Sequence, residues 1–155
     1  MKRAEFLAAT GLDLITYKNL RHRGLIPDMQ DLEGHTNFYV KDAIRMRIML
    51  EVMKTGGLPA GAANSFAVFV WAFVDMTWGS NIEGLRHAEI WGGVGDDLSN
   101  VFSKDHRNCV AYGKVEACAS ELANGGRARR IFMVNVSRAV DHVLRSVEAQ
   151  EAGDA

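Results

Sequence analysis

Apolar residues in the first quarter of the chain recur at helical spacing and predict two short helices separated by a tight turn. The first covers residues 3–10 and ends at Gly11. The second covers residues 14–23, with Asp13 as a good N-cap and Gly24 as a left-handed C-terminal cap. Two short helices joined in this way form a helix-turn-helix.

The next pattern is typical of a hairpin followed by a longer helix. Residues 28–37 are polar, with Gly34 near the middle, and Phe38 and Tyr39 follow them. We interpret this stretch as a wing. Residues 41–54 then place apolar side chains on one broad face of a helix, which predicts an element with a large buried surface.

The pattern of apolar and polar residues changes in the second half of the chain. An apolar helix is expected from Pro59 to about Trp78, and short alternating runs follow it. These runs predict strands at 87–91, 109–112 and 131–136, a helix at 114–123 and a last helix from Ser137, with a frayed tail from Glu148. The predicted fold class is α+β and mainly helical. A winged helix-turn-helix occupies residues 1–60, a smaller α+β dimerisation or sensing unit occupies 61–150, and 151–155 form the tail.

The composition and the apolar segments of the chain indicate which class of protein and which compartment to expect. The 155 residues are 48% hydrophobic and 24% charged, which is ordinary for a globular protein. The first ten residues lack the apolar core of a secretory signal, so a cytoplasmic protein is expected. Residues 66–78 are strongly apolar, but Asp75 interrupts them and they fall short of the roughly 20 residues that span a bilayer. We predict a buried helix there and no membrane partner.

The net charge of -1 hides a local excess of cations. Four basic or titratable residues lie between Asp13 and Asp28 with no acid among them: Lys18, Arg21, His22 and Arg23. A polyanion can approach such a segment. A helix held by a tight turn can project this face into the major groove, where Asn19 suits adenine, while Ile15 and Leu20 are expected to face the core.

The run of residues 16–27 resembles the recognition helix of the MerR family and the exit from it. Its identities are Thr16, Gly24, Leu25 and Pro27, and Lys18 matches by charge. Gly34, Phe38 and Tyr39 resemble the wing of that family, and the helix from Lys41 resembles its third helix. The similarity covers residues 3–63, about two fifths of the chain, and consists of several weak signals in the right order.

The resemblance implies that the second helix and the wing contact DNA. The candidate DNA-binding residues are Thr16, Tyr17, Lys18, Asn19, Arg21, His22, Arg23, His35, Asn37 and Tyr39. Tyr39 is expected near a phosphate, with core packing beneath the wing as the alternative. Asn19 and Leu20 stand where the family has an aromatic pair, so its sequence preference is not carried over.

Other chemistries have weaker signals. Aromatic residues at positions 69, 71, 73 and 78 suit a drug-sensor pocket or, more commonly, a plain core. His106, Cys109 and Cys118 are too few and too loosely spaced to predict a metal site. The glycines at 92, 93 and 95 lack the ending of a phosphate loop and favour a turn or strand kink. No catalytic constellation is recognisable, so neither an enzyme nor a cofactor is expected.

These patterns together predict a sequence-specific transcription regulator that binds double-stranded DNA as a homodimer on a two-fold operator. Whether the second unit also binds a small-molecule effector is left open. The main alternative is a phage-type DNA-architectural factor, such as an excisionase or a small terminase subunit. A further alternative is a protein-interaction module that has lost DNA binding.

Overall fold

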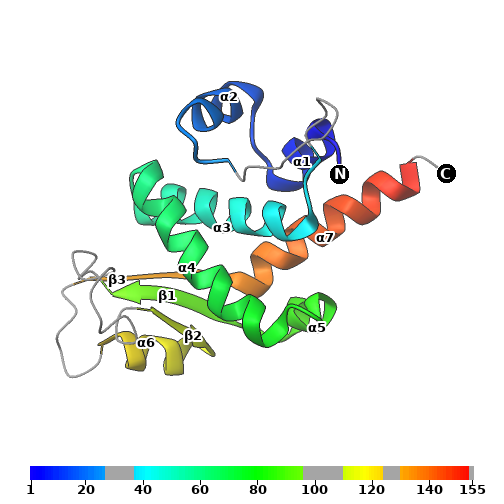
Figure 1. Ribbon diagram of the computed structural model, residues 1–155. Helices are drawn as coiled ribbons and strands as arrows, with labels where there is room; N and C mark the ends of the chain where they lie inside the picture. Colours follow the sequence, from blue (N-terminus) through cyan, green and yellow to red (C-terminus); the bar gives the residue numbers. More distant parts are fainter. Residues whose placement is uncertain (27–36, 96–109, 124–129, 154–155) are drawn as a thin grey trace.

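A computed structural model describes residues 1–26, 37–95, 110–123 and 130–153 (Figure 1). Within these ranges the fold is mainly helical α+β, as predicted, and it consists of seven helices and a small three-stranded antiparallel sheet. The elements in chain order are α1 (Arg3–Thr10), α2 (Leu14–His22), α3 (Val40–Gly56), α4 (Ala60–Trp78), α5 (Ile82–His87), β1 (Trp91–Gly95), β2 (Val110–Gly113), α6 (Val115–Ala123), β3 (Ile131–Asn135) and α7 (Val136–Gly153).

The first two helices have their predicted bounds to within one residue. Helix α1 ends at Gly11, whose φ of +71° is the left-handed conformation that glycine tolerates best. Asp13 caps α2, since its Oδ1 accepts a 2.9 Å hydrogen bond from the amide of Thr16. Gly24 follows α2 with a φ of +66°. The predicted caps at these three positions are therefore confirmed.

Three buried aromatic rings fix α2 on the rest of the fold. Phe6 of α1 stacks on Phe38, with ring centroids 3.9 Å apart, and Tyr17 of α2 meets both rings edge-on at 6.5 and 6.4 Å. Phe38 lies just before α3, and its amide donates a 2.8 Å hydrogen bond to the carbonyl of Met1. The cluster thus joins α1, α2 and the start of α3.

Helices α3 and α4 form the centre of the molecule, and both were predicted close to their observed bounds. Seven side chains of α4 are buried, among them Phe66, Val70 and Val74. By length and composition alone α4 could cross a membrane, with 19 residues and a mean hydropathy of 1.2, and 39% of that window is buried here. Core helices share such a composition, so this is weak evidence for a membrane span. The predicted buried helix is present.

The sheet has the strand order β2-β1-β3, with both pairs antiparallel. The strand predicted at 87–91 starts later, because Asn81 caps a helix through the amide of Gly84 and α5 continues to His87. Only Trp91 of the predicted segment lies in β1. The other two strands lie within about one residue of their predicted bounds.

The glycine run that favoured a turn or kink is the middle of strand β1. A Cβ on Gly92 would lie 2.2 Å from Cγ1 of Val70 in α4, and a Cβ on Gly93 would lie 2.5 Å from Cδ1 of Leu122 in α6. Neighbouring residues of a strand face opposite sides. The two glycines therefore let α4 and α6 pack closely on the two faces of the central strand, which corrects the turn interpretation.

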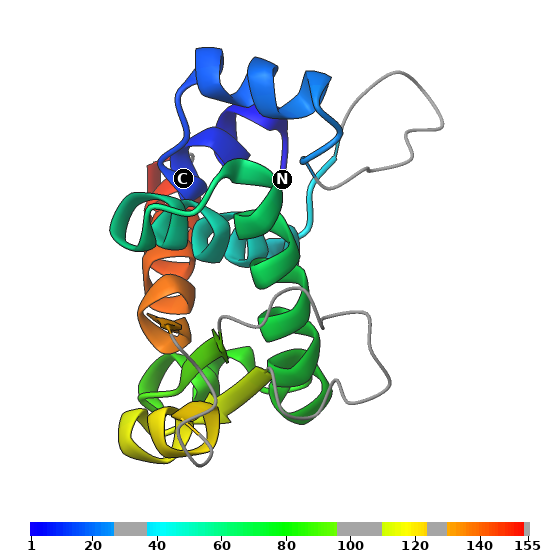
Figure 2. The same cartoon turned by 90° about the vertical axis from the view of Figure 1, so that its left-hand side faces the viewer.

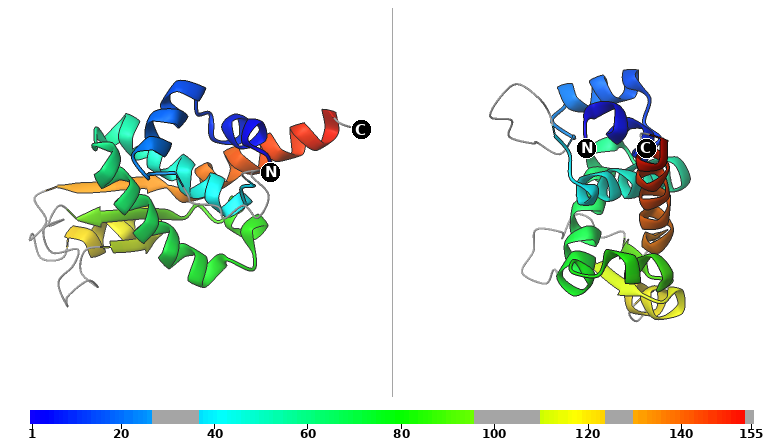
Figure 3. Two further views of the ribbon diagram at one scale, coloured as in Figure 1. Left: turned by 45° about the horizontal axis from the view of Figure 1, so that its top comes forward. Right: turned by 90° about the vertical axis from the view of Figure 1, so that its right-hand side faces the viewer.

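The last helix is longer than predicted. Asn135 caps α7 by accepting a hydrogen bond from the amide of Arg138 at 2.8 Å, and the helix continues to Gly153. The tail predicted from Glu148 is wrong as far as Gly153, because Glu148 and Gln150 are held by contacts to α5 and α1. Figure 3 shows α7 running from the sheet to the side of α1. Residues on both sides of the predicted domain boundary share one hydrophobic cluster.

Candidate nucleic-acid interface

Helix α2 lies at the end of the molecule opposite α6 (Figures 1 and 2). One face of this helix is polar and exposed. The exposed residues of this face and of the residue after it are Lys18, Asn19, Arg21, His22 and Arg23. Tyr17 and Leu20 point the other way, with 1% and 3% of their surface exposed. Five of the ten predicted DNA-binding residues are thus brought together on one accessible surface.

The cations of this α2 face have no carboxylate partner in the part of the chain that the structure describes. The ion pairs found there involve other cations, at positions 41, 47, 86, 87 and 145. Of the acids that the structure describes, Asp13 is the nearest in sequence to Lys18, and it accepts hydrogen bonds from the hydroxyl and the amide of Thr16, which lower the pKa of Asp13. Among the described residues, the positive charge of Lys18 and Arg21 is therefore not offset by a carboxylate.

Two residues that were predicted to contact DNA also take part in the structure of α2. Tyr17 is buried in the aromatic cluster, so its side chain does not reach the α2 face, which corrects that prediction. Thr16 is half-buried, and its hydroxyl donates a 2.6 Å hydrogen bond to Oδ2 of Asp13. Thr16 therefore completes the N-terminal cap of α2.

The structure also corrects the position of Ile15, which was expected to face the core. Ile15 is 74% exposed and its neighbour Leu14 is 45% exposed. The phase of the helix is set by the burial of Tyr17 and Leu20, three residues apart, and Ile15 lies on the opposite side. An apolar side chain is thus part of the α2 face.

Only the end of the predicted wing lies among the described residues. His35 lies outside the described residues, as does most of the predicted hairpin, and Asn37 is exposed. Tyr39 is 70% exposed, which rules out the alternative that it packs in the core. Its amide donates a 3.0 Å hydrogen bond to Asp42, so the backbone of Tyr39 caps α3 while its ring faces solvent.

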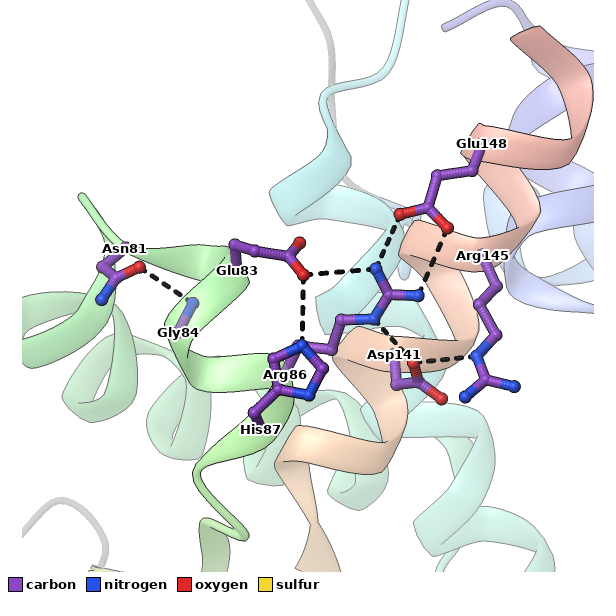
Figure 4. A network of polar contacts seen from close by, with 8 residues as sticks. All are labelled: Asn81, Glu83, Gly84, Arg86, His87, Asp141, Arg145 and Glu148. Atoms are coloured by element: carbon purple, nitrogen blue, oxygen red, sulfur yellow. Dashed lines mark hydrogen bonds and ion pairs between the residues drawn. The ribbon is translucent and has the colours of Figure 1, made fainter. Parts of the chain in front are cut away.

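A second group of charged residues joins α5 to α7 (Figure 4). The guanidinium of Arg86 reaches Asp141 at 2.7 Å and both carboxylate oxygens of Glu148 at 2.6 and 3.2 Å, with Glu83 at 3.4 Å. Arg145 adds a 2.9 Å contact to Asp141. Arg86 lowers the pKa of Asp141 and that of Glu148, while their hydrogen bonds raise the pKa of Arg86. This network cross-links two helices.

A hollow of about 430 Å³ lies beside the turn between α1 and α2. Its lining residues are Gly11, Leu12, Asp13, Thr16, Arg47, Leu50, Glu51, Met53 and Lys54. Arg47 donates hydrogen bonds to the carbonyl of Thr10 at 3.2 Å and to Glu51 at 2.6 Å, which ties the turn to α3. None of the four aromatic residues considered for a sensor pocket lines this hollow; Trp71, for example, is 7% exposed and packs in the core.

The described residues give little support to a metal site. His106 and Cys109 lie outside the described residues. Cys118 is buried, its thiol donates to the carbonyl of Ala111 at 3.5 Å, and burial raises its pKa to about 11. Among the described residues no group of three or more His, Cys, Asp or Glu side chains is placed to hold a metal ion. Cys118 therefore packs as a small apolar residue.

No protein-family model matches the chain, and no curated protein matches it significantly. A functional assignment therefore depends on the geometry of the chain's own residues. The feature with the clearest chemical meaning is the exposed, acid-free α2 face on a helix that is capped at its start and anchored by three aromatic rings.

Proposed function

We propose that this protein is a DNA-binding transcription regulator that uses α2 as its recognition helix. The observation that supports this most directly is the exposure of Lys18, Asn19, Arg21, His22 and Arg23 on one surface, with no ion pair to them among the described residues. The resemblance of residues 16–27 to the MerR family supports the same interpretation.

Several side chains of the α2 face have the chemistry that contacts with DNA require. Lys18 and Arg21 donate hydrogen bonds to phosphates or to guanine O6 and N7, and Asn19 suits the N6 and N7 edge of adenine. Position 18 lies four residues before position 22, so Lys18 and His22 occupy successive turns of one helix face. The exposed ring of Tyr39 lies at the start of α3, where a hydroxyl can contact a phosphate.

We further propose that two copies of the chain bind one operator. A single helix of nine residues makes few base contacts, and two half-sites give useful specificity. Helix α4 exposes Val68, Phe73 and Met76 at 38, 37 and 85%. Residues 60–74 carry no charge, so this face suits a second copy of the same apolar surface better than a charged partner.

Selection of bound sequences from a random double-stranded DNA pool tests the proposal, with affinity then measured across a salt series. The expected result is an enriched inverted repeat and an affinity that falls steeply with salt, because each neutralised phosphate releases counterions. Bending or cooperative coating of DNA without an enriched motif would favour the architectural alternative. Binding that is weak and insensitive to salt would leave a protein-interaction module.

A further inference from the structure

Two branched apolar side chains lie at the start of the α2 face, where the described part of the chain leaves much of their surface exposed. Ile15 is 74% exposed and Leu14 is 45% exposed, although the same helix buries Tyr17 and Leu20 almost completely. Ile15 precedes Lys18, Asn19 and His22 by three, four and seven residues. It therefore lies in the middle of the polar stripe rather than at its edge.

The local structure of α2 does not require an isoleucine at this position. A hydrophobic staple at a helix start uses the residue before the N-cap, which here is the buried Leu12, and the residue at the fourth helical position, which is the buried Tyr17. A β-branched residue is also a weaker helix former than alanine or lysine. A polar residue at position 15 would therefore support folding about as well as Ile15 does.

Resting on the proposed function, we infer that Ile15 is a specificity residue that contacts the C5-methyl group of a thymine in the major groove. The N-terminal residues of a recognition helix meet base edges, and Ile15 is the second residue of α2. Thymine is the one base that presents an apolar group in that groove. Lys18 and Asn19, one turn later, would hold the helix in register beside it.

The surroundings of Ile15 favour DNA over a protein partner. The apolar surface consists of Ile15 and its neighbour Leu14, which is small for a protein interface, and cations and an amide border it on the next turn. A base step in the major groove offers the same mixture, since a thymine methyl group lies beside phosphates and polar base edges.

The test replaces thymines of the selected operator by uracil, one position at a time, because uracil differs only by the missing methyl group. At one position in the half-site, uracil should weaken binding of the wild-type protein about fourfold, the value of one methyl group removed from water. Ile15→Ala should bind the thymine operator more weakly and should not distinguish thymine from uracil there. Ile15→Val should keep a reduced preference for thymine.

Val115→Ala is the matched control, since Val115 is an aliphatic residue of α6 that is 38% exposed at the opposite end of the molecule. It should keep the full thymine preference. A half-site without thymine, or an equal preference for thymine in the wild type and in Ile15→Ala, would overturn the role of Ile15 while leaving DNA binding intact. Failure to enrich any DNA sequence would overturn both the role and the proposed function.

Discussion

Two charged surfaces of this molecule differ in how their charges are paired. On the α2 face, Lys18 and Arg21 are exposed and have no ion pair among the described residues. Between α5 and α7, Arg86 is only 13% exposed at its side chain and is surrounded by the carboxylates of Glu83, Asp141 and Glu148. Both surfaces carry arginines, but among the described residues only those between α5 and α7 are paired with carboxylates.

The difference separates two uses of charge. A guanidinium enclosed by carboxylates is already neutralised, so it holds two helices together and offers little to a polyanion. Cations that have no carboxylate partner within the protein contribute little to its stability and can attract a polyanion. Changes on the α2 face should therefore alter binding without altering stability, and changes at Arg86 should do the reverse.

The largest effect is expected from the aromatic cluster that positions the α2 face. Phe38→Ala removes the ring that stacks on Phe6 at 3.9 Å and supports Tyr17, and such a change costs about 3–5 kcal/mol of unfolding free energy. Urea denaturation measures the loss. Phe38→Leu, which keeps most of the volume, is the control and should lose much less. A cost for Phe38→Ala below about 1 kcal/mol would show that the cluster does not anchor α2.

The double substitution Lys18→Ala with Arg21→Ala should lower operator affinity at least 100-fold, or about 2.7 kcal/mol, since two charge-assisted contacts are lost. The slope of log affinity against log salt should flatten by about 1.8, at about 0.9 for each phosphate contact. The free energy of unfolding, measured by thermal denaturation, should change by less than about 0.5 kcal/mol, because both side chains are exposed.

Lys54→Ala with Arg138→Ala is the matched control for this double substitution, since it removes two exposed cations from α3 and α7 and so changes the net charge equally. Its affinity should stay within a few fold of the wild type. Equal losses in the two double variants would mean that overall charge, rather than the α2 face, drives binding.

The sequence predicted the first two helices and the turn between them well because their limits depend on local signals. Gly11, Asp13 and Gly24 act on their own neighbours, and each has its predicted conformation or hydrogen bond. The inward and outward sides of α2 were harder to predict, since positions 14, 15, 17 and 20 are all apolar or aromatic. Which of them are buried depends on Phe6 and Phe38, which lie on other elements.

The second half was less predictable because its structure depends on distant contacts. The space above Gly92 is filled by Val70, and no local pattern around position 92 shows that a helix lies so close. Similarly, the end of α7 is held by Arg86, which lies 62 residues before Glu148. A polar stretch at a chain end is typical of a frayed tail, and only the tertiary partner distinguishes the two cases.

The Arg86 network should give stability that depends on pH. Arg86 lowers the pKa of Asp141 and Glu148, so its contribution is present above the unfolded carboxyl pKa of about 4 and is lost as the pH falls through the folded values. Arg86→Gln should therefore be less stable than the wild type at pH 7, by less than Phe38→Ala, and this difference should shrink below about pH 4. Urea denaturation at several pH values measures it.

The control for this series is Arg138→Gln, which changes an exposed arginine of α7, the helix that carries Asp141 and Glu148, and it should match the wild type at every pH. Burial, and the charge of Arg47, also lower the pKa of His142, so stability falls as the pH drops below about 6.5, but the wild type and Arg86→Gln share this effect. A stability difference that is constant with pH would contradict the pairing of Arg86 with the carboxylates. Operator affinity at pH 7 should be unchanged.

The smallest effect is expected from a substitution on the buried side of α2. The hydroxyl of Tyr17 is buried and has no hydrogen-bond partner among the described residues, which is an unfavourable state for a polar group. Tyr17→Phe keeps both ring contacts and removes that group, so it should stabilise the protein by about 1 kcal/mol in urea denaturation and leave operator affinity unchanged. A loss of stability would mean that the hydroxyl is hydrogen-bonded after all. A loss of affinity at unchanged stability would mean that Tyr17 contacts DNA, and the boundary between the anchoring and binding sides of α2 would then lie elsewhere.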